Sequence, residues 1–184
     1  NLGKGYVDLM VMYIDSNGTE LWKKRYGGSA NDAPDQSAID TLNGCLYVAG
    51  ISNSADGDIT YRTGTKLVMS PNIYNQNIWV TKIDTIGNVL DSKEYGSIIY
   101  PAEYVTAMTL FENKLWLGAY YHFGGGGGDM ESPEPPESDT MDNAWIGITD
   151  TALNLICKYT IRTNCLARVQ DFFKYNSNLY AFGY

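Results

Sequence analysis

Apolar and polar positions follow one another in short runs that end at turn-forming residues. The runs at residues 7–15, 21–26 and 46–51 are rich in β-branched, aromatic and apolar side chains, and each has the length of a strand. They meet at Asp-x-x-Gly or Asn-Gly clusters, which favour hairpin turns because these residues accept positive φ. A helical period of 3.6 residues is absent, so the pattern predicts an all-β chain of antiparallel hairpins.

The pattern occurs three times along the chain. Asp15 and Asp84 end equivalent strands 69 residues apart, and a more divergent third copy places Asp150 a further 66 residues on. A second shared position is aromatic in every copy: Tyr47, Trp116 and Tyr180. Recurrence of Asp at a turn indicates that its carboxylate binds local N–H groups, and recurrence of aromatics indicates core positions. Each repeat unit is predicted to form four strands.

Residues 9–12 are apolar on both faces of a predicted strand, which is typical of sheets covered on both sides. Four-stranded antiparallel sheets in tandem predict a β-propeller-like arrangement of blades. The predicted division is the last hairpin of a blade (1–36), two blades (37–103 and 104–168) and the first hairpin of another (169–184). Because closed propellers have about 4 to 8 blades, we expect an incomplete ring. The rest of a larger propeller, or a partner chain, would then cover its open edges.

Composition excludes several classes of protein. The chain has 184 residues, of which 44% are hydrophobic, and a net charge of −8. This charge disfavours nucleic-acid binding, which requires a basic surface. No apolar run approaches the roughly 20 residues of a spanning helix. The single His122 and the lack of any CxxC spacing disfavour zinc. Cys157 and Cys165 would pair only in an oxidising compartment, and Cys45 would then be left over.

Two stretches carry a family resemblance: LWKKRYGGSAND at residues 21–32 and NGCLYVAGISNS at 43–54. They resemble the W-x-K-x-YGGS and DGG-Y-x-x-AG-x-S-x-S motifs of tandem β-propeller repeats in secreted and surface proteins of Bacteroidota. The second copy keeps only Tyr95-Gly96-Ser97, and the third is more divergent. The resemblance implies a propeller fold and a secreted or outer-membrane, cell-surface location, as a lipoprotein or as type IX secretion cargo. It implies no activity.

Two insertions, at residues 55–76 and 123–142, lie between the second and third strands of the predicted blades. The second contains five consecutive glycines and a Pro/Glu-rich stretch, and it is expected to be an exposed flexible lobe. Aromatic residues outside the shared positions, together with the one histidine, are the candidates for ligand binding: Tyr61, Tyr74, Tyr100, Tyr120, Tyr121 and His122.

Asn53, Asp56 and Asp58 offer clustered oxygen ligands for Ca²⁺. They lack the spacing of an EF-hand loop, and acidic turn residues commonly accept backbone N–H bonds instead. Both interpretations stay open at this point, and no other cofactor is predicted.

No catalytic constellation is visible, so the leading hypothesis is a non-catalytic surface or secreted segment. It would bind a protein or a glycan through loops on its rim. One alternative is part of a propeller glycoside hydrolase or lyase that uses paired carboxylates. Another is a purely structural spacer without a ligand of its own.

Overall fold

The computed structural model describes residues 5–59, 76–96, 103–121, 128–130, 142–161 and 165–184. Tyr61, Tyr74, Tyr100 and His122 lie outside the described residues. The strands are β1 Leu9–Ile14, β2 Glu20–Tyr26, β3 Asp32–Asp40, β4 Cys45–Ser52, β5 Asn77–Asp84, β6 Val89–Tyr95, β7 Glu103–Phe111, β8 Lys114–Tyr121, β9 Asn143–Thr149, β10 Leu155–Ile161, β11 Val169–Tyr175 and β12 Asn178–Gly183. One short 3₁₀ helix, η1, spans Gly128–Met130.

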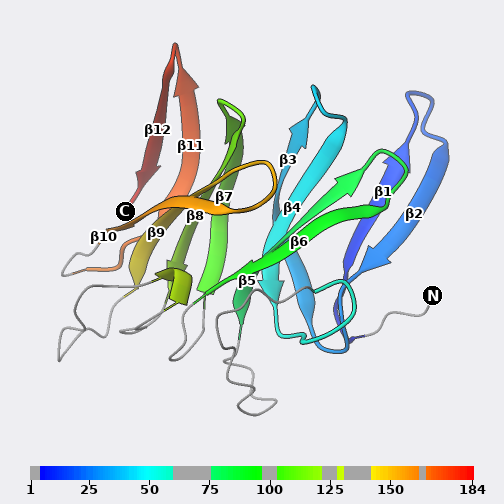
Figure 1. Cartoon of the computed structure of the whole chain (residues 1–184), viewed down its shortest axis with the longest axis horizontal. Helices are drawn as coiled ribbons and strands as arrows, with labels where there is room; N and C mark the ends of the chain where they lie inside the picture. The colour runs from blue at the N-terminus through cyan, green and yellow to red at the C-terminus, as the bar shows by residue number, and fades with distance from the viewer. Residues whose placement is uncertain (1–4, 60–75, 97–102, 122–127, 131–141, 162–164) are drawn as a thin grey trace.

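The strands form two four-stranded sheets, β3-β4-β5-β6 and β7-β8-β9-β10, between the two-stranded sheets β1-β2 and β11-β12. Every pairing is antiparallel. The sheets stand side by side in chain order, with β1-β2 at one end and β11-β12 at the other (Figure 1). The prediction of an all-β chain with four-stranded antiparallel sheets is therefore confirmed. The first of these sheets begins at Asp32, which pairs with Ser52.

Alternate residues of a strand face opposite neighbouring sheets. In β5, Trp79 and Ile83 pack toward the β1-β2 hairpin, whereas Ile78 and Val80 pack toward the β7-β10 sheet. All four are at most 1% exposed. A third core lies between β7-β10 and β11-β12 and is built around Ile146. Burial of both faces explains why these strands lack a polar face.

The turns depart in detail from the sequence prediction. At Asn43-Gly44 only Gly44 has a positive φ, of 60°. Residues 41–44 form a longer turn, in which the Asp40 carboxylate accepts bonds from the backbone N–H groups of Leu42 and Asn43. The two-residue turn with positive φ at both positions is instead Glu112-Asn113, with φ of 50° and 56°. Such turns match the twist of a hairpin.

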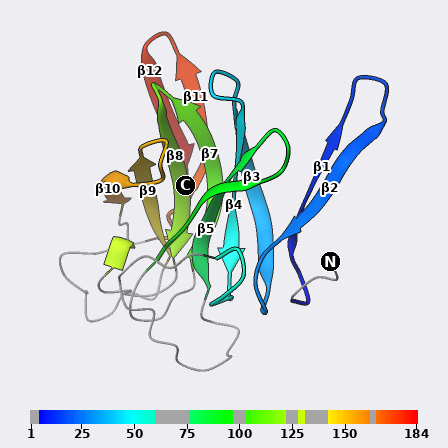
Figure 2. The same cartoon turned by 45° about the vertical axis from the view of Figure 1, so that its right-hand side comes forward.

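The antiparallel order gives the sheets two distinct ends. Hairpin turns such as 15–19, 84–88 and 150–154 lie at one end, which we call the turn rim. The opposite end, where β4 and β8 finish and β3 and β7 begin, we call the loop rim. In Figure 2 the loop rim lies at the bottom of β3 and β4. Both predicted insertions start from the loop rim.

The second insertion was expected to be an exposed flexible lobe. For η1, which belongs to this insertion, the structure contradicts that expectation. Met130 is fully buried and belongs to the core between the two four-stranded sheets. The backbone N–H of Asp129 donates to the Gly96 carbonyl at 3.0 Å. An apolar side chain next to the glycine run thus ties this part of the segment to the core.

Candidate functional site

The loop rim of the first four-stranded sheet is organised around Asp32, which is fully buried. Its carboxylate accepts bonds from the hydroxyls of Ser52 and Ser54, at 2.6 and 2.7 Å, and from the backbone N–H of Gly28 at 2.7 Å. A buried carboxylate needs such donors because it has lost its hydration. The YGGS-x-x-D and S-x-S motifs therefore form one network that holds the loop at residues 27–32.

Asp56 and Asp58, candidates for a calcium site, bind this same loop. Asp56 Oδ1 accepts a bond from the Ser29 N–H at 2.7 Å, and Asp58 Oδ2 accepts one from the Gly27 N–H at 3.1 Å. The third candidate, Asn53, donates its backbone N–H to the Asn31 carbonyl at 2.9 Å. Among the described residues no cluster of three or more His, Cys, Asp or Glu could hold a metal. The geometry favours the backbone-binding interpretation of these residues.

The loop rim of the second four-stranded sheet carries a stack of aromatic and cationic groups. Tyr104 and Tyr120 lie directly opposite each other on β7 and β8. Their rings are stacked, with centroids 5.0 Å apart and planes 12° apart. The guanidinium carbon of Arg168 lies 3.9 Å from the Tyr120 centroid, well within cation–π range. We call these three residues the rim stack.

Asp142 holds the arginine of the rim stack in place. Its Oδ2 accepts bonds from Arg168 Nε at 2.9 Å and from Nη2 at 2.5 Å. The Asp142 side chain is 4% exposed and that of Arg168 is 27% exposed. Arg168 also exchanges backbone bonds with Tyr184, at 2.6 and 3.2 Å. Asp142 therefore fixes the guanidinium and Tyr184 fixes the backbone of the same residue, while part of the side chain still contacts solvent.

These contacts change the electrostatics of the stack. Burial lowers the pKa of the Arg168 guanidinium, but the hydrogen bond to Asp142 and the charges of Tyr120, Asp142 and Tyr184 together outweigh it, and the net pKa is raised. Burial raises the pKa of Tyr120, against the opposing effect of the Arg168 charge. Arg168 thus stays cationic and Tyr120 stays a neutral phenol over the ordinary pH range.

The structure separates two adjacent candidate residues. Tyr120 is half-buried in the rim stack, whereas Tyr121 is 1% exposed and packs in the core between the four-stranded sheets. Tyr121 therefore does not offer its ring to a ligand, contrary to the expectation from sequence. Sequence reasoning missed Tyr104, Asp142 and Arg168. A regular register from the Glu112-Asn113 turn would place Tyr104 opposite Tyr121, and the irregularity between Val105 and Ala107 places it opposite Tyr120 instead. Arg168 reaches the stack only through the tertiary fold.

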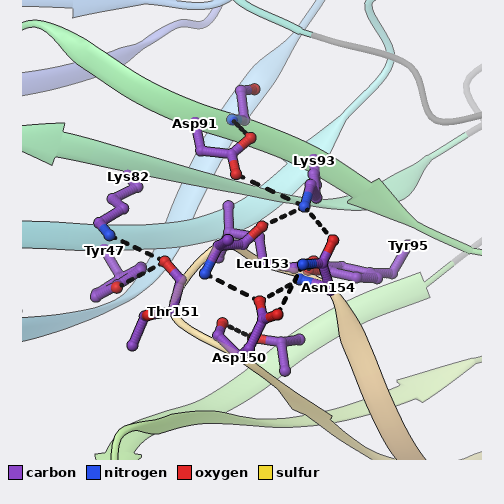
Figure 3. A network of polar contacts seen from close by, with 12 residues as sticks. Tyr47, Lys82, Asp91, Lys93, Tyr95, Asp150, Thr151, Leu153 and Asn154 are labelled. Atoms are coloured by element: carbon purple, nitrogen blue, oxygen red, sulfur yellow. Dashed lines mark hydrogen bonds and ion pairs between the residues drawn. The ribbon is translucent and has the colours of Figure 1, made fainter.

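A second polar network joins β6 to the turn at residues 150–154 of the neighbouring sheet (Figure 3). From β6, the Lys93 ammonium contacts the Ala152 carbonyl and lies 3.0 Å from Asn154 Oδ1. The Tyr95 hydroxyl donates to the Leu153 carbonyl at 2.6 Å. All three acceptors belong to the turn at residues 150–154. One sheet therefore binds the turn of the next.

The same contact recurs one repeat earlier. The Lys24 ammonium donates to the carbonyls of Ile86 and Gly87 at 2.9 and 2.8 Å, and the Tyr26 hydroxyl donates to Gly87 at 2.9 Å. Burial, reinforced by nearby carboxylates, raises the pKa of Tyr26 to about 12. We call this recurring Lys-x-Tyr contact the turn clamp. It gives the Lys-x-Tyr pattern a structural role.

The recurring aspartates serve the turns themselves. The carboxylates of Asp15, Asp84 and Asp150 each accept bonds from backbone N–H groups two and four residues on. For Asp84, the hydrogen bond from the Asn88 N–H is the main cause of a pKa below the ordinary value. The interpretation of these residues as turn caps agrees with the structure.

The fold and its contacts define the chain as an all-β protein built of several antiparallel sheets. No protein-family model matches the sequence, and no curated protein matches it. Within the part of the chain that the structure describes, no helix is long and apolar enough to cross a membrane. Cys45 and Cys157 form no disulfide, so no disulfide joins Cys157 to Cys165.

Proposed function

We propose that the chain is a non-catalytic binding segment of the β-propeller type, which recognises a neutral glycan or a non-acidic protein surface at its loop rim. The propeller arrangement is supported by sheets that stand in chain order. It is also supported by the neighbouring positions of their first strands, β3, β7 and β11. The motif resemblance supports a secreted or cell-surface location.

The observation that carries the proposal is the rim stack. Tyrosine and arginine are the residue types on which binding energy concentrates, because they offer large contact area together with polar groups. Asp142 fixes the Arg168 side chain, so binding would cost little side-chain entropy there. The Arg168 Nη1 group donates to no acceptor among the described residues. It remains able to donate to a ligand hydroxyl or carbonyl.

The charge of the chain limits the ligand. A net charge of −8 repels polyanions, so acidic glycans and nucleic acids are disfavoured. Tyr120 contacts both Tyr104 and Arg168. The part of the Arg168 side chain that contacts solvent is therefore where a ligand would bind. Its N–H groups can donate to the hydroxyls of a sugar or to the carbonyls of a protein.

Three described carboxylates of the loop rim already have structural roles, which supports a binding role over catalysis. Asp32 is fully buried, and Asp56 and Asp58 bind backbone N–H groups. A glycosidase needs an exposed pair of carboxyl groups about 5 to 9.5 Å apart, free to transfer protons and attack the sugar. Hydrolysis of a glycan by the chain is therefore expected only if the glycoside hydrolase alternative is correct.

The test is a glycan-array screen with the full chain, followed by titration calorimetry on the oligosaccharides that bind. The same variants are compared in a crosslinking pull-down from a cell-envelope protein extract. Arg168→Ala is expected to weaken binding at least about tenfold, as a central contact residue does. Tyr104→Ala is expected to weaken binding because Tyr104 supports Tyr120 in the rim stack. Tyr175→Ala is the matched control, because Tyr175 is 58% exposed at the turn rim.

Equal binding by Tyr104→Ala, Arg168→Ala and the native chain to every probe that binds would contradict the rim-stack proposal. Cleavage of an array glycan by the native chain would instead establish the glycoside hydrolase alternative. Circular dichroism and urea unfolding of both variants show whether a loss of binding reflects a loss of folding.

A further inference from the structure

The first strands of three successive sheets share one irregularity. β3, β7 and β11 each contain one residue more than the strand segment with which they pair, and the extra residues are Asp35, Thr106 and Gln170. All three stand at the same position of the repeat, and all three are polar. The three strands are neighbours in the fold. Because a bulge re-aims the side chain of its extra residue, this position can serve contacts between sheets.

Thr106 shows what the bulge does in the second four-stranded sheet. Its hydroxyl contacts the carbonyl oxygen of Val169 on β11 and lies 3.3 Å from the Gly118 carbonyl oxygen of its own sheet. Val169 directly precedes the extra residue of β11. Because a carbonyl group only accepts, the Thr106 hydroxyl is the donor. The side chain therefore joins two neighbouring sheets through their first strands.

Asp35 occupies the position of Thr106 in the first four-stranded sheet. The acceptor equivalent to Val169 is then Val105, which directly precedes the extra residue of β7. An ionised carboxylate cannot bond to a carbonyl, because both groups only accept, whereas a protonated carboxyl group has one O–H donor. The Asp35 side chain forms no hydrogen bond with another described residue. Its carboxyl group is therefore available for such a contact.

We propose that Asp35 bridges β3 to β7 when its carboxyl group is protonated, and that the bridge opens when the group ionises. The O–H group of the protonated form donates to the Val105 carbonyl, as Thr106 donates to Val169. Acid therefore tightens the contact between the two four-stranded sheets. This inference goes beyond the proposed function and does not depend on the rim stack or on a ligand.

The surroundings of Asp35 favour the protonated form. Burial raises the pKa of Asp35 above its ordinary value of 3.8, and the side chain still reaches solvent, so it can exchange its proton. On β3 itself, Asp32 and Asp40 are held by donors of their own loops. The strands packed against β3 are β1, β4 and β7, and their titratable residues are Tyr13, Cys45, Tyr47, Glu103 and Tyr104. None of these is a base, so none supplies a positive charge that would favour ionised Asp35.

The sign of the pH dependence follows from the raised pKa. A carboxyl group whose pKa is raised by folding stabilises the chain increasingly as the pH falls through the folded value, and the gain is complete below 3.8. The turn-capping residues Asp15, Asp84 and Asp150 act in the opposite sense, because folding lowers the pKa of each. The contribution of Asp35 is therefore measured as a difference between the native chain and a variant.

The first test is a carbon-detected NMR titration of the full native chain. The Asp35 carboxyl carbon is expected to titrate with a midpoint above 3.8, and the Val105 carbonyl carbon is expected to shift with the same midpoint. In Asp35→Asn, the Val105 shift at that midpoint should disappear. The Val169 carbonyl carbon is the internal control, because its donor, Thr106, does not titrate.

The second test is urea unfolding between about pH 7 and about pH 4, a range over which the Asp35 carboxyl group gains protons. Asp35→Thr supplies a donor at every pH, so the urea midpoint should rise at neutral pH and the advantage over the native chain should shrink in acid. Thr106→Asp should lower the midpoint at neutral pH and recover part of the loss in acid. Thr106→Val is the matched control, because it loses the donor at every pH and should recover nothing.

Three results would overturn the proposal. The first is an Asp35 midpoint at or below 3.8, and the second is a Val105 carbonyl carbon that does not titrate with Asp35. The third is a difference between the native and Asp35→Thr chains that stays the same at every pH. The titration of the native chain needs no variant, so it decides the proposal even if a substituted chain does not fold.

Discussion

Replacing Lys93 by methionine is expected to destabilise the chain by loosening one sheet from the next. The Lys93 side chain is 9% exposed and lies 3.6 Å from Asp91 Oδ2. Its ammonium also contacts two oxygens of the turn at residues 150–154. Methionine keeps most of the apolar stem and removes the charged donor. The substitution therefore tests the turn clamp rather than the packing of the stem.

The magnitude follows from the acceptors that lose their donor. Hydrogen bonds to a charged group contribute about 1.5–3 kcal/mol each, and the contributions in one network are not additive. Asp91 is 31% exposed and regains water after the change. The Ala152 carbonyl and Asn154 Oδ1, which lose the Lys93 donor as well, regain less water than Asp91 does. We expect a loss of about 2–3 kcal/mol in the free energy of unfolding.

The assay is urea unfolding followed by tryptophan fluorescence at one fixed protein concentration, because association would otherwise change the apparent stability. The matched control is Lys23→Met, since Lys23 is 47% exposed and pairs only with Glu20 across the surface. That change is expected to stay within about 0.5 kcal/mol. A loss for Lys93→Met no larger than for Lys23→Met would refute the structural role of the turn clamp.

Three further predictions concern single positions. The pKa of Tyr26 is about 12 in the folded chain, against an ordinary 10.0. Its contribution to stability is therefore full below pH 10 and lost as the pH rises toward 12. Tyr26→Phe should flatten this decline in urea unfolding, whereas Tyr6→Phe, at a fully solvated ring, should not. Gly118→Ala places a Cβ 2.6 Å from Val169 Cγ1. The expected loss in the free energy of unfolding is about 1–3 kcal/mol. An unchanged free energy of unfolding would mean that β11 packs less closely on β8. Glu112→Asn is expected to stabilise the chain by about 0.5–1 kcal/mol, because Asn tolerates the φ of 50° better than Glu. The midpoint of thermal unfolding should therefore rise, and a lower midpoint would contradict this.

Strands and their partners within each unit could be predicted from the sequence. The alternation of turn residues with apolar runs locates the hairpins, because a turn and its two flanking strands interact over a few residues only. The recurrence of Asp15, Asp84 and Asp150, at spacings of 69 and 66 residues, relates one sheet to the next. The turn-capping role of these aspartates could also be predicted, since their carboxylates bind N–H groups two and four residues away.

The candidate site could be predicted only in part. A period of two places Tyr120 and Tyr121 on opposite faces of β8, and the sequence does not say which face meets another sheet. The structure buries Tyr121 against the β3-β6 sheet and leaves Tyr120 at the rim. That assignment depends on a neighbour that is far away along the chain.

By itself, the sequence determined the strands, the hairpins, the repeat and the acidic charge, because these depend on local backbone preferences and on composition. Only the tertiary structure decided which loops bind to one another, how Lys93 reaches the next sheet and where Arg168 meets Tyr120 and Asp142. The reason is that these contacts join residues on different sheets. Their geometry depends on how the sheets pack, which no local pattern of residues specifies.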